Sequence, residues 1–322
     1  MAWNEIRGQE LVKRIWQRHL ADGRVPNAYL LVGPDGVGKR RLALEMAKAL
    51  NCAAEGSRPC DHCACCTQIG RGVHPDVQHL VPSGASDAIR IDEVRQLLGR
   101  LALRPFSARV QVAVIEHVER FTEEAANSLL KVLEEPSARA HFLLTTSMVR
   151  DCLPTVVSRC QLLRCHPLSV GLMAQMLIET HGTNPQTAEI IARLSGGSAA
   201  RATELAAQWS AYQQTLARVA KGTLAAWTEQ PLPETRQELT QLLDGMVAWL
   251  RDLAMAASGD RRWIAHTTQD ALVQRQASGL DVDRCVETAF ELMALRESLE
   301  QFVSPRLVAA LAREKWLSLA EK

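Results

Sequence analysis

A glycine-rich loop stands directly between an apolar run and a helical pattern near the start of the chain. The apolar run is Ala-Tyr-Leu-Leu-Val-Gly at residues 28–33, and the loop continues through Gly36 and Gly38 to Lys39. The spacing Gly33-x4-Gly38-Lys39 is typical of a phosphate-binding loop, whose backbone N–H groups and one ammonium surround phosphates at a helix N-terminus. A glycine-rich turn without a ligand is the alternative, and the strand–loop–helix context favours the phosphate loop.

Short apolar runs alternate with helical patterns over residues 27–167. This alternation is typical of βαβ units and predicts an α/β fold with a parallel sheet. Strands are expected at residues 28–33, 76–81, 110–115, 142–146 and 161–164. Helices are expected over residues 39–50, 92–101 and 123–135.

The helix between the third and fourth strands has the clearest boundaries. Thr122 is a suitable N-cap, and Glu123 and Glu124 suit the positive N-terminus of a helix. Pro136 is expected to end this helix because proline cannot continue the hydrogen-bond ladder. The apolar stripe expected to face the sheet consists of Ala126, Leu129, Leu130 and Leu133.

The strand pattern disappears after residue 167, and an all-α region is expected from there. Residues 168–205 predict a small helical unit that turns at residues 195–198. Three long amphipathic patterns follow, over residues 235–256, 283–302 and 305–320. Trp249 and Trp316 lie within them and are expected to anchor a core or a subunit interface rather than to stack on bases. The other tryptophans of this region are Trp209, Trp227 and Trp263.

The bulk composition is that of a globular protein. Of 322 residues, 47% are hydrophobic and 23% charged, which argues against wholesale disorder. A formal net charge of +1 removes any whole-molecule electrostatic case for nucleic-acid binding. No apolar run approaches the ~20 residues that span a bilayer, and the N-terminus does not resemble a signal peptide. We therefore expect a cytoplasmic protein without a membrane partner.

The residues that would complete a hydrolytic site around the phosphate loop are replaced. Enzymes with this loop carry Ser or Thr after the lysine to hold Mg²⁺, and here that residue is Arg40. The third strand ends in Glu116 and His117, where such a site requires Asp for the metal and then Glu to polarise water. Glutamate is one methylene too long for the first role, and histidine supplies no permanent carboxylate for the second. We therefore predict no hydrolysis.

Five of the nine cysteines fall within residues 52–66, a crowding that favours a metal site over disulfides in a cytosolic protein. Cys52, Cys60, Cys63 and Cys66 form C-x7-C-x2-C-x2-C, and an all-thiolate set selects Zn²⁺. Four protein ligands leave no open position, so the zinc is expected to be structural. The alternative is a loop of reduced thiols without metal. The cysteines expected to be buried apolar residues are Cys152, Cys165 and Cys285.

Several of these stretches together resemble bacterial DNA polymerase III clamp-loader subunits, which are AAA+ proteins. The resemblance rests on the strand alternation, the cysteine cluster, and the stretches Asn-Ser-Leu-Leu-Lys-Val-Leu-Glu-Glu-Pro (127–136) and Leu-Pro-Thr-Val-Val-Ser-Arg-Cys (153–160). The replaced catalytic residues look like the delta-prime branch rather than the ATP-hydrolysing gamma/tau branch. The match covers residues 1–205 with specific motifs. Beyond them it rests on helical character and on Val-Ser-Pro-Arg-Leu at 303–307.

The resemblance implies a domain order and a set of partners. It implies a RecA-like domain over residues 1–167 with an inserted zinc module at 52–66, a helical lid over 168–206 and a helical collar over 207–322. Partners implied are the gamma/tau and delta subunits in a hetero-pentamer, with the sliding clamp and primed DNA as indirect partners. Nucleotide binding at the chain's own Gly33, Gly36, Gly38 and Lys39 is expected to be weak or absent.

The same resemblance makes Arg159, in the motif Ser158-Arg159-Cys160, an arginine finger inserted into the ATP site of the adjacent gamma subunit. A guanidinium is planar, always charged and suited to γ-phosphate oxygens. Taken without the surrounding motif, a lone arginine is more often a surface ion pair. Family members usually have eight residues in the first gap of the cysteine motif, and this chain has seven. The resemblance therefore leaves Cys65 or Cys66 as the fourth ligand.

Two further family positions depart from a working site. Residues 145–147 stand where the family places a polar phosphate sensor, and we expect them to cap the strand instead. Arg201 is displaced by one residue from the lid sensor, a rotation of about 100° on a helix, and is not expected to reach phosphate. The alternative functions are a self-sufficient AAA+ ATPase, which Arg40, Glu116 and His117 argue against, and a zinc-ribbon nucleic-acid-binding module. The neutral charge and the lack of a basic–aromatic stripe disfavour the zinc ribbon.

Overall fold

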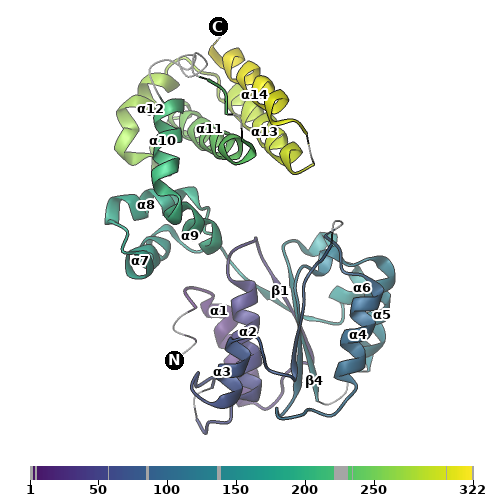
Figure 1. The fold of residues 1–322 in the computed structure, drawn as a ribbon. Helices are drawn as coiled ribbons and strands as arrows, with labels where there is room; N and C mark the ends of the chain where they lie inside the picture. Colours follow the sequence, from purple (N-terminus) through teal and green to yellow (C-terminus); the bar gives the residue numbers. More distant parts are fainter. Residues whose placement is uncertain are drawn as a thin grey trace. The chain divides into compact units, whose positions relative to one another are not determined.

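The computed structural model describes residues 3, 6–56, 58–84, 87–135, 139–220, 231–233, 235–301 and 303–320, with only the backbone of residues 300 and 320. The chain folds into two compact units. The first comprises Met1–Leu172 and Gly197–Ala200, and the second comprises Met173–Gly196 and Arg201–Lys322. Figure 1 shows the sheet of the first unit and the helices of the second. The predicted helix stop at Pro136 and the tryptophan at 227 lie outside the described residues.

The first unit is built on a parallel sheet of five strands in the order β2-β3-β4-β1-β5. The predicted α/β class is therefore confirmed, and every predicted strand is present to within two residues at each end. The strands are β1 (Ala28–Val32), β2 (Val77–Leu80), β3 (Gln111–Ile115), β4 (Ala140–Thr146) and β5 (Gln161–Arg164).

Alternate residues of the strands point to opposite faces of the sheet, and each face has its own helical layer. Tyr29 and Leu31 of β1 pack on the side of α1 and α2, whereas Leu30 packs on the side of α4 and α5. Figure 1 shows these two layers on either side of β1 and β4. The helices are α1 (Glu10–Ala21), α2 (Lys39–Asn51), α3 (Ala64–Gly70), α4 (Ile91–Leu101), α5 (Glu123–Glu134) and α6 (Pro154–Val157); α1, α3 and α6 were not predicted.

Helix α5 has the predicted start and most of the predicted buried stripe, whereas Leu130 is only half-buried. Thr122 is its N-cap, and the Thr122 Oγ1 accepts a hydrogen bond of 3.3 Å from the backbone N–H of Ala125. Ala126, Leu129 and Leu133 are buried against the sheet. The stripe therefore fixes the rotation of α5 and leaves Glu134, its last residue, at the surface.

The described residues of the second unit form helices and connecting loops, with no strand. The three long predicted patterns are confirmed as α11, α13 and α14, and Trp249 and Trp316 are buried in the core that these helices share. None of the described helices is long and apolar enough to cross a membrane. The helices are α7 (Val170–His181), α8 (Pro185–Leu194), α9 (Ala199–Ala207), α10 (Trp209–Val219), α11 (Arg236–Ala257), α12 (Asp270–Ala277), α13 (Val282–Glu300) and α14 (Pro305–Ala320).

Candidate functional site

The glycine-rich loop follows β1 and ends at α2, so it lies at the carboxyl edge of the sheet. Gly38 is the N-cap of α2 with φ 95°, and Gly36 has φ 76°. Both angles lie in the left-handed region that favours glycine, which explains the glycine at each position. Glu116 follows β3 and Ser147 follows β4, and parallel strands bring their carboxyl ends to the same edge as the loop.

The ammonium of Lys39 is occupied by the chain's own oxygens. Lys39 Nζ donates to the carbonyl oxygens of Gly33 (2.5 Å) and Pro34 (3.0 Å) and to Asp35 Oδ1 (3.1 Å). An ammonium has three donors, so three acceptors satisfy it fully. Lys39 is buried, and a phosphate would have to displace these partners from a desolvated charge.

A short stretch beyond the sheet also closes on the loop. The backbone N–H groups of Ala199 and Ala200 both donate to the carbonyl oxygen of Gly36, at 2.9 and 3.3 Å. A Cβ at Gly36 would clash with Ser198 Oγ. Both this close approach and the left-handed backbone therefore require glycine at position 36. The loop is therefore held in place by chain contacts that involve no nucleotide.

The two replaced metal-site residues contact each other. Arg40 Nε lies 3.2 Å from Glu116 Oε1, although the pair is not aligned as a hydrogen bond. The Arg40 side chain is 63% exposed and that of Glu116 only 12%. Burial and the charge of Arg40 together lower the pKa of nearby His79. Arg40 thus stands at the sequence position where a hydrolytic loop of this type carries the hydroxyl that holds Mg²⁺.

A second carboxylate at this edge, Glu119, was not predicted from the sequence. Its Oε1 accepts hydrogen bonds from the Ser147 Oγ (2.8 Å) and backbone N–H (3.1 Å) and lies 3.2 Å from His117 Nδ1. Burial alone would raise the pKa of Glu119, but hydrogen bonds from its own backbone N–H, Thr146 and Ser147 lower it to about 2. The ionised carboxylate therefore joins the 3-10 turn Val118–Arg120 to the end of β4.

Residues 145–147 make internal contacts, as the sequence favoured. Thr145 Oγ1 accepts from the backbone N–H of His117 at 3.2 Å, and Thr146 Oγ1 accepts from that of Met148 at 3.2 Å. Ser147 Oγ also lies 3.1 Å from Asp35 Oδ1, so it stands between the glycine-rich loop and the end of β4.

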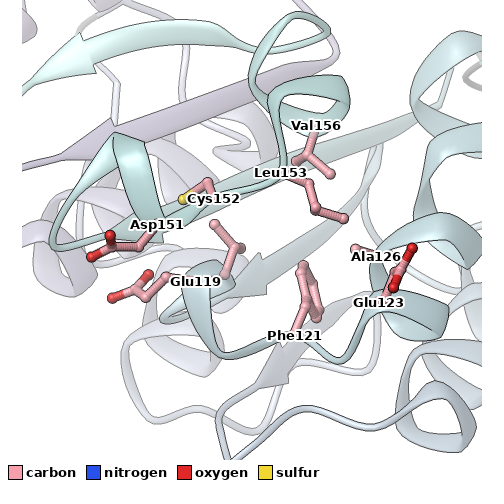
Figure 2. A pocket seen from close by; sticks show the side chains of 9 residues that line it. Glu119, Phe121, Glu123, Ala126, Asp151, Cys152, Leu153 and Val156 are labelled. Carbon is pink, nitrogen blue, oxygen red and sulfur yellow. The ribbon is translucent and has the colours of Figure 1, made fainter.

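Figure 2 shows a pocket beside Glu119, between the 3-10 turn Val118–Arg120, the start of α5 and the start of α6. Its volume is about 180 Å³, below the ~300 Å³ at which ligand sites usually begin. Its polar side chains are the carboxylates of Glu119, Glu123 and Asp151, which would repel a phosphate. This pocket does not fit a nucleotide.

Arg159 lies at the opposite edge of the sheet from the glycine-rich loop. It precedes β5, in which Gln161 pairs with Tyr29 and Arg164 with Val32. The loop follows Val32, so about four residues of strand, roughly 13 Å, separate the two edges. Arg159 therefore cannot serve its own chain's loop, and any phosphate that it contacts must belong to another molecule.

The guanidinium of Arg159 has partners within the chain. It donates to the Thr155 carbonyl oxygen (3.0 Å) and to Ser158 Oγ (3.3 Å), and it pairs with the Glu134 carboxylate of α5. Its side chain is 33% exposed. A pocket of about 440 Å³ lies beside it, lined in part by Asn27, Glu134 and Cys160. Arg159 is thus partly exposed and paired with a carboxylate of its own chain.

The four cysteines predicted to bind metal come together. The Sγ atoms of Cys52, Cys60, Cys63 and Cys66 all lie within 4.8 Å of one another. A tetrahedral zinc with Zn–S bonds of about 2.3 Å holds its sulfurs roughly 3.8 Å apart, so a small contraction fits the ion. Cys65 does not belong to this group.

Local backbone structure prepares these thiols as ligands. Cys63 is the N-cap of α3, and its Sγ accepts from the backbone N–H of Cys66 at 3.4 Å. Cys60 Sγ accepts in turn from the N–H of Cys63 at 3.4 Å. Burial opposes ionisation, but hydrogen bonds from the backbone of Ala53 and Cys66 lower the pKa of Cys63 to about 6. The thiolate is the form that binds metal, so this favours Cys63 as a ligand, whereas burial raises the pKa of Cys66.

Comparison with known proteins gives matches to DNA polymerase III subunits. The family model described as DNA polymerase III, delta subunit, matches residues 8–169. DNA polymerase III subunit delta' of Bacillus subtilis strain 168 is 32% identical over 206 residues, which cover 64% of this chain and 61% of that protein. Subunit delta' of Pseudomonas aeruginosa PAO1 is 34% identical over 234 residues, which cover 68% and 71% respectively.

More distant matches extend to other subunits. DNA polymerase III subunit tau of Escherichia coli K12 is 32% identical over 200 residues, which cover 60% of this chain and 31% of that protein. The crystal structure of a DNA polymerase III gamma subunit-related protein from Thermotoga maritima aligns over 96% of this chain and 99% of that one. Its TM-score is 0.49 and its sequence identity 15%.

Proposed function

This chain belongs to the DNA polymerase III delta-prime family of clamp-loader subunits, and from that premise we propose that it completes a neighbour's ATP site without hydrolysing ATP itself. The observation that carries the proposal is the placement of Arg159 at the amino edge of the sheet, away from the chain's own phosphate loop. An accessible arginine in that place serves a nucleotide only when another subunit brings one.

The chain's own loop supports the non-catalytic half of the proposal. Lys39 is satisfied by three oxygens of the loop, and Arg40 faces Glu116 in place of a metal. His117 follows where a water-activating carboxylate would be needed. An ATP-hydrolysing subunit of the gamma/tau kind would require all three of these arrangements to change.

The catalytic half requires an exchange of partners at Arg159. The guanidinium now pairs with Glu134, and a γ-phosphate arriving from the neighbouring subunit would replace that carboxylate. A phosphate carries more negative charge than a carboxylate and can accept hydrogen bonds from the same planar guanidinium. The exchange is therefore favourable. A finger supplied in trans contributes about 10³–10⁵ in rate at the site that it completes.

The cysteine cluster supports a structural zinc in the module at residues 52–66. Four thiolates satisfy a tetrahedral ion completely, so the metal has no open position for catalysis. When bound, the zinc would cross-link the end of α2 to the start of α3 through Cys52, Cys60, Cys63 and Cys66.

The assembly we propose is the hetero-pentamer with gamma/tau and delta subunits, acting in the cytoplasm on the sliding clamp and primed DNA. In it, residues 1–167 form the AAA+ domain, residues 168–206 the lid and residues 207–322 the collar. Relatives named gamma and tau support a complex of this kind.

Reconstitution tests this function. The purified chain is mixed with gamma (or tau) and delta subunits of the same organism, and ATP-driven loading of the clamp onto primed DNA is measured with and without it. We expect the chain to enter the complex and to raise both the loading rate and the DNA-stimulated ATPase. A complex that forms and loads clamps equally well without this chain would contradict the proposal.

A further inference from the structure

A tryptophan of the second unit lies exposed on the short turn that follows α11. Trp263 is 62% exposed, and it ends the 3-10 turn Arg261–Trp263. Trp249 and Trp316, by contrast, are buried in the core of this unit. The core therefore does not use Trp263, and the function proposed above does not use it either.

This turn is held from behind by side chains of two helices. The carboxylate of Asp252, buried on α11, accepts hydrogen bonds from the backbone N–H groups of Ala265 (3.0 Å) and His266 (2.8 Å). Arg193 Nη1 of α8 donates to the carbonyl oxygen of Arg262 at 2.7 Å. Segments with few such contacts open locally, so these bonds hold the turn in one conformation.

The indole ring of Trp263 is also held by one edge. Hydrogen bonds from Arg262 and, to a smaller extent, from the Trp263 side chain lower the pKa of the Asp260 carboxyl. The Nε1–H group is the only donor of an indole, so this edge of the ring faces Asp260. The polar edge is therefore engaged within the chain, while most of the ring surface remains in solvent.

An unpaired cation precedes the ring by two residues. The Arg261 guanidinium is exposed and makes no hydrogen bond or ion pair with any described residue. Arg262, by contrast, donates from Nε and Nη2 to the two carboxylate oxygens of Asp260, at 3.0 and 2.9 Å. With two arginines and one aspartate, the turn therefore carries net positive charge beside an exposed aromatic ring.

We propose that residues 260–263, the Trp263 turn, are a contact site for single-stranded DNA. A base would stack on Trp263, and an adjoining phosphate would pair with Arg261. Stacking on an aromatic ring accepts every base, so the site would bind without sequence preference. The proposal rests on the proposed function only in that a clamp loader brings the chain to primed DNA, whose template is unpaired beyond the primer.

The surroundings of Trp263 favour this occupant over a protein. A protein interface needs an apolar centre built from several side chains. The other large apolar side chains that are exposed in the described part of the second unit belong to α7, α13 and α14, and none lies within residues 258–269. A base needs only one ring face with a cation nearby. Bases inside a duplex are already stacked on each other, so the strand must be single.

The test is equilibrium binding of the full chain to a labelled oligodeoxythymidylate of about 16 nucleotides, measured by fluorescence anisotropy at low salt. Trp263→Ala should weaken binding roughly fivefold or more, because a stacking contact is lost. Trp263→Phe should keep most of the affinity, since it keeps an aromatic ring. Phe290→Ala is the matched control, because Phe290 is also aromatic and 66% exposed in the second unit but lies on α13. The control should stay within about twofold of wild type.

A second pair of changes tests the phosphate contact. Arg261→Ala should weaken binding and should reduce the slope of log affinity against log salt by about 0.7, the value for one phosphate contact on a single strand. Arg261→Lys should keep the wild-type slope, because an ammonium also pairs with phosphate. The Arg261 side chain has no partner among the described residues, so its removal should leave the melting temperature unchanged. The Arg261 variants therefore decide even if Trp263→Ala lowers the melting temperature.

The outcomes separate this site from the proposed function, because the titration uses the chain by itself. If the wild-type chain does not bind the strand, or if Trp263→Ala and Arg261→Ala bind it as wild type does, the site is wrong and the clamp-loader function stands. A duplex of the same length that binds as tightly as the single strand would overturn base stacking. Variants of the Trp263 turn that bind DNA normally but fail to join gamma and delta subunits would assign the turn to a protein partner. A wild-type chain that binds DNA but fails to join those subunits would contradict the proposed function alone.

Discussion

Arg40 and Glu116 face each other at 3.2 Å across the carboxyl edge of the sheet. Each stands at a sequence position where a hydrolytic site would carry a metal ligand. The two replacing residues contact each other, so the two changes are structurally linked. The exposure of Arg40 limits the stability of the pair to less than about 1 kcal/mol. Its importance is positional, because a cation rather than a hydroxyl follows Lys39 and faces Glu116.

The chain alone should therefore show no ATP turnover above background, measured as phosphate release in the presence of Mg²⁺. Arg40→Thr should not restore it, because Lys39 remains bound to Gly33, Pro34 and Asp35 and no carboxylate stands at position 117. Magnesium-dependent hydrolysis by the wild-type chain, abolished by Lys39→Ala, would show that this expectation is wrong.

Protein purified under reducing conditions without chelator should contain one zinc ion per chain, measured by elemental analysis. Cys63→Ser should release the metal, because a hydroxyl replaces a thiolate in a closed four-sulfur set. Cys65→Ser is the matched control and should keep the metal, because Cys65 does not belong to the cluster. Metal-free wild-type protein would rule the site out, and loss of metal from the Cys65 variant would change the ligand set.

Local signals in the sequence were sufficient for much of this structure. Strand β5 and helix α14 have the predicted bounds, and α14 begins at Pro305, because proline is favoured at the first helical position. The N-cap at Thr122 could be predicted because capping depends on residues three positions apart. The cysteine cluster could be predicted for the same reason, since gaps of two residues bring three of its four thiols together locally.

Contacts between distant residues left no such signal. Glu134 is 25 residues from Arg159, and nothing in either stretch indicates that they pair. The left-handed conformation of His117 (φ 55°) aims its ring at Glu119, but histidine is not a residue from which that angle is predicted. These pairings depend on how helices and loops pack on the sheet. The residue pattern of a single segment does not predict that packing.

Glu119 should make the stability of the protein depend on pH in the acid range. Its folded pKa of about 2 lies below the ordinary value of 4.5, so its contribution is fully present above about pH 4.5 and is lost as the pH falls toward 2. At neutral pH this difference corresponds to about 3 kcal/mol before any screening by solvent. Glu119→Gln should therefore lower the free energy of unfolding in urea at pH 7.

The same comparison at pH 3 provides the control. The difference in unfolding free energy between wild type and Glu119→Gln should be smaller at pH 3 than at pH 7. At pH 3 the stabilisation by the ionised wild-type carboxylate is already partly lost. Glu123→Gln, an exposed carboxylate of the neighbouring helix, should change little at either pH. A difference that is the same at both pH values would mean that the carboxylate charge is not what stabilises this edge.

Arg159 and Glu134 give the sharpest test of action in trans. Arg159→Ala removes a partly exposed ion pair, so it should cost less than about 1 kcal/mol of stability and leave assembly intact. The reconstituted loader should nevertheless lose part of its DNA- and clamp-stimulated ATPase, because one ATP site lacks its finger. Arg159→Lys should rescue poorly, since a point charge does not reproduce a two-pronged contact.

Glu134→Gln separates the finger from the ion pair. This change breaks the same intrachain pair but keeps the guanidinium and removes its competing carboxylate, so the loader's ATPase should be unchanged or higher. A purely structural pair would instead make Glu134→Gln and Arg159→Ala alike in every assay. If both variants assemble normally and both loaders match wild type in ATPase and clamp-loading rates, Arg159 is a surface ion pair and not a finger.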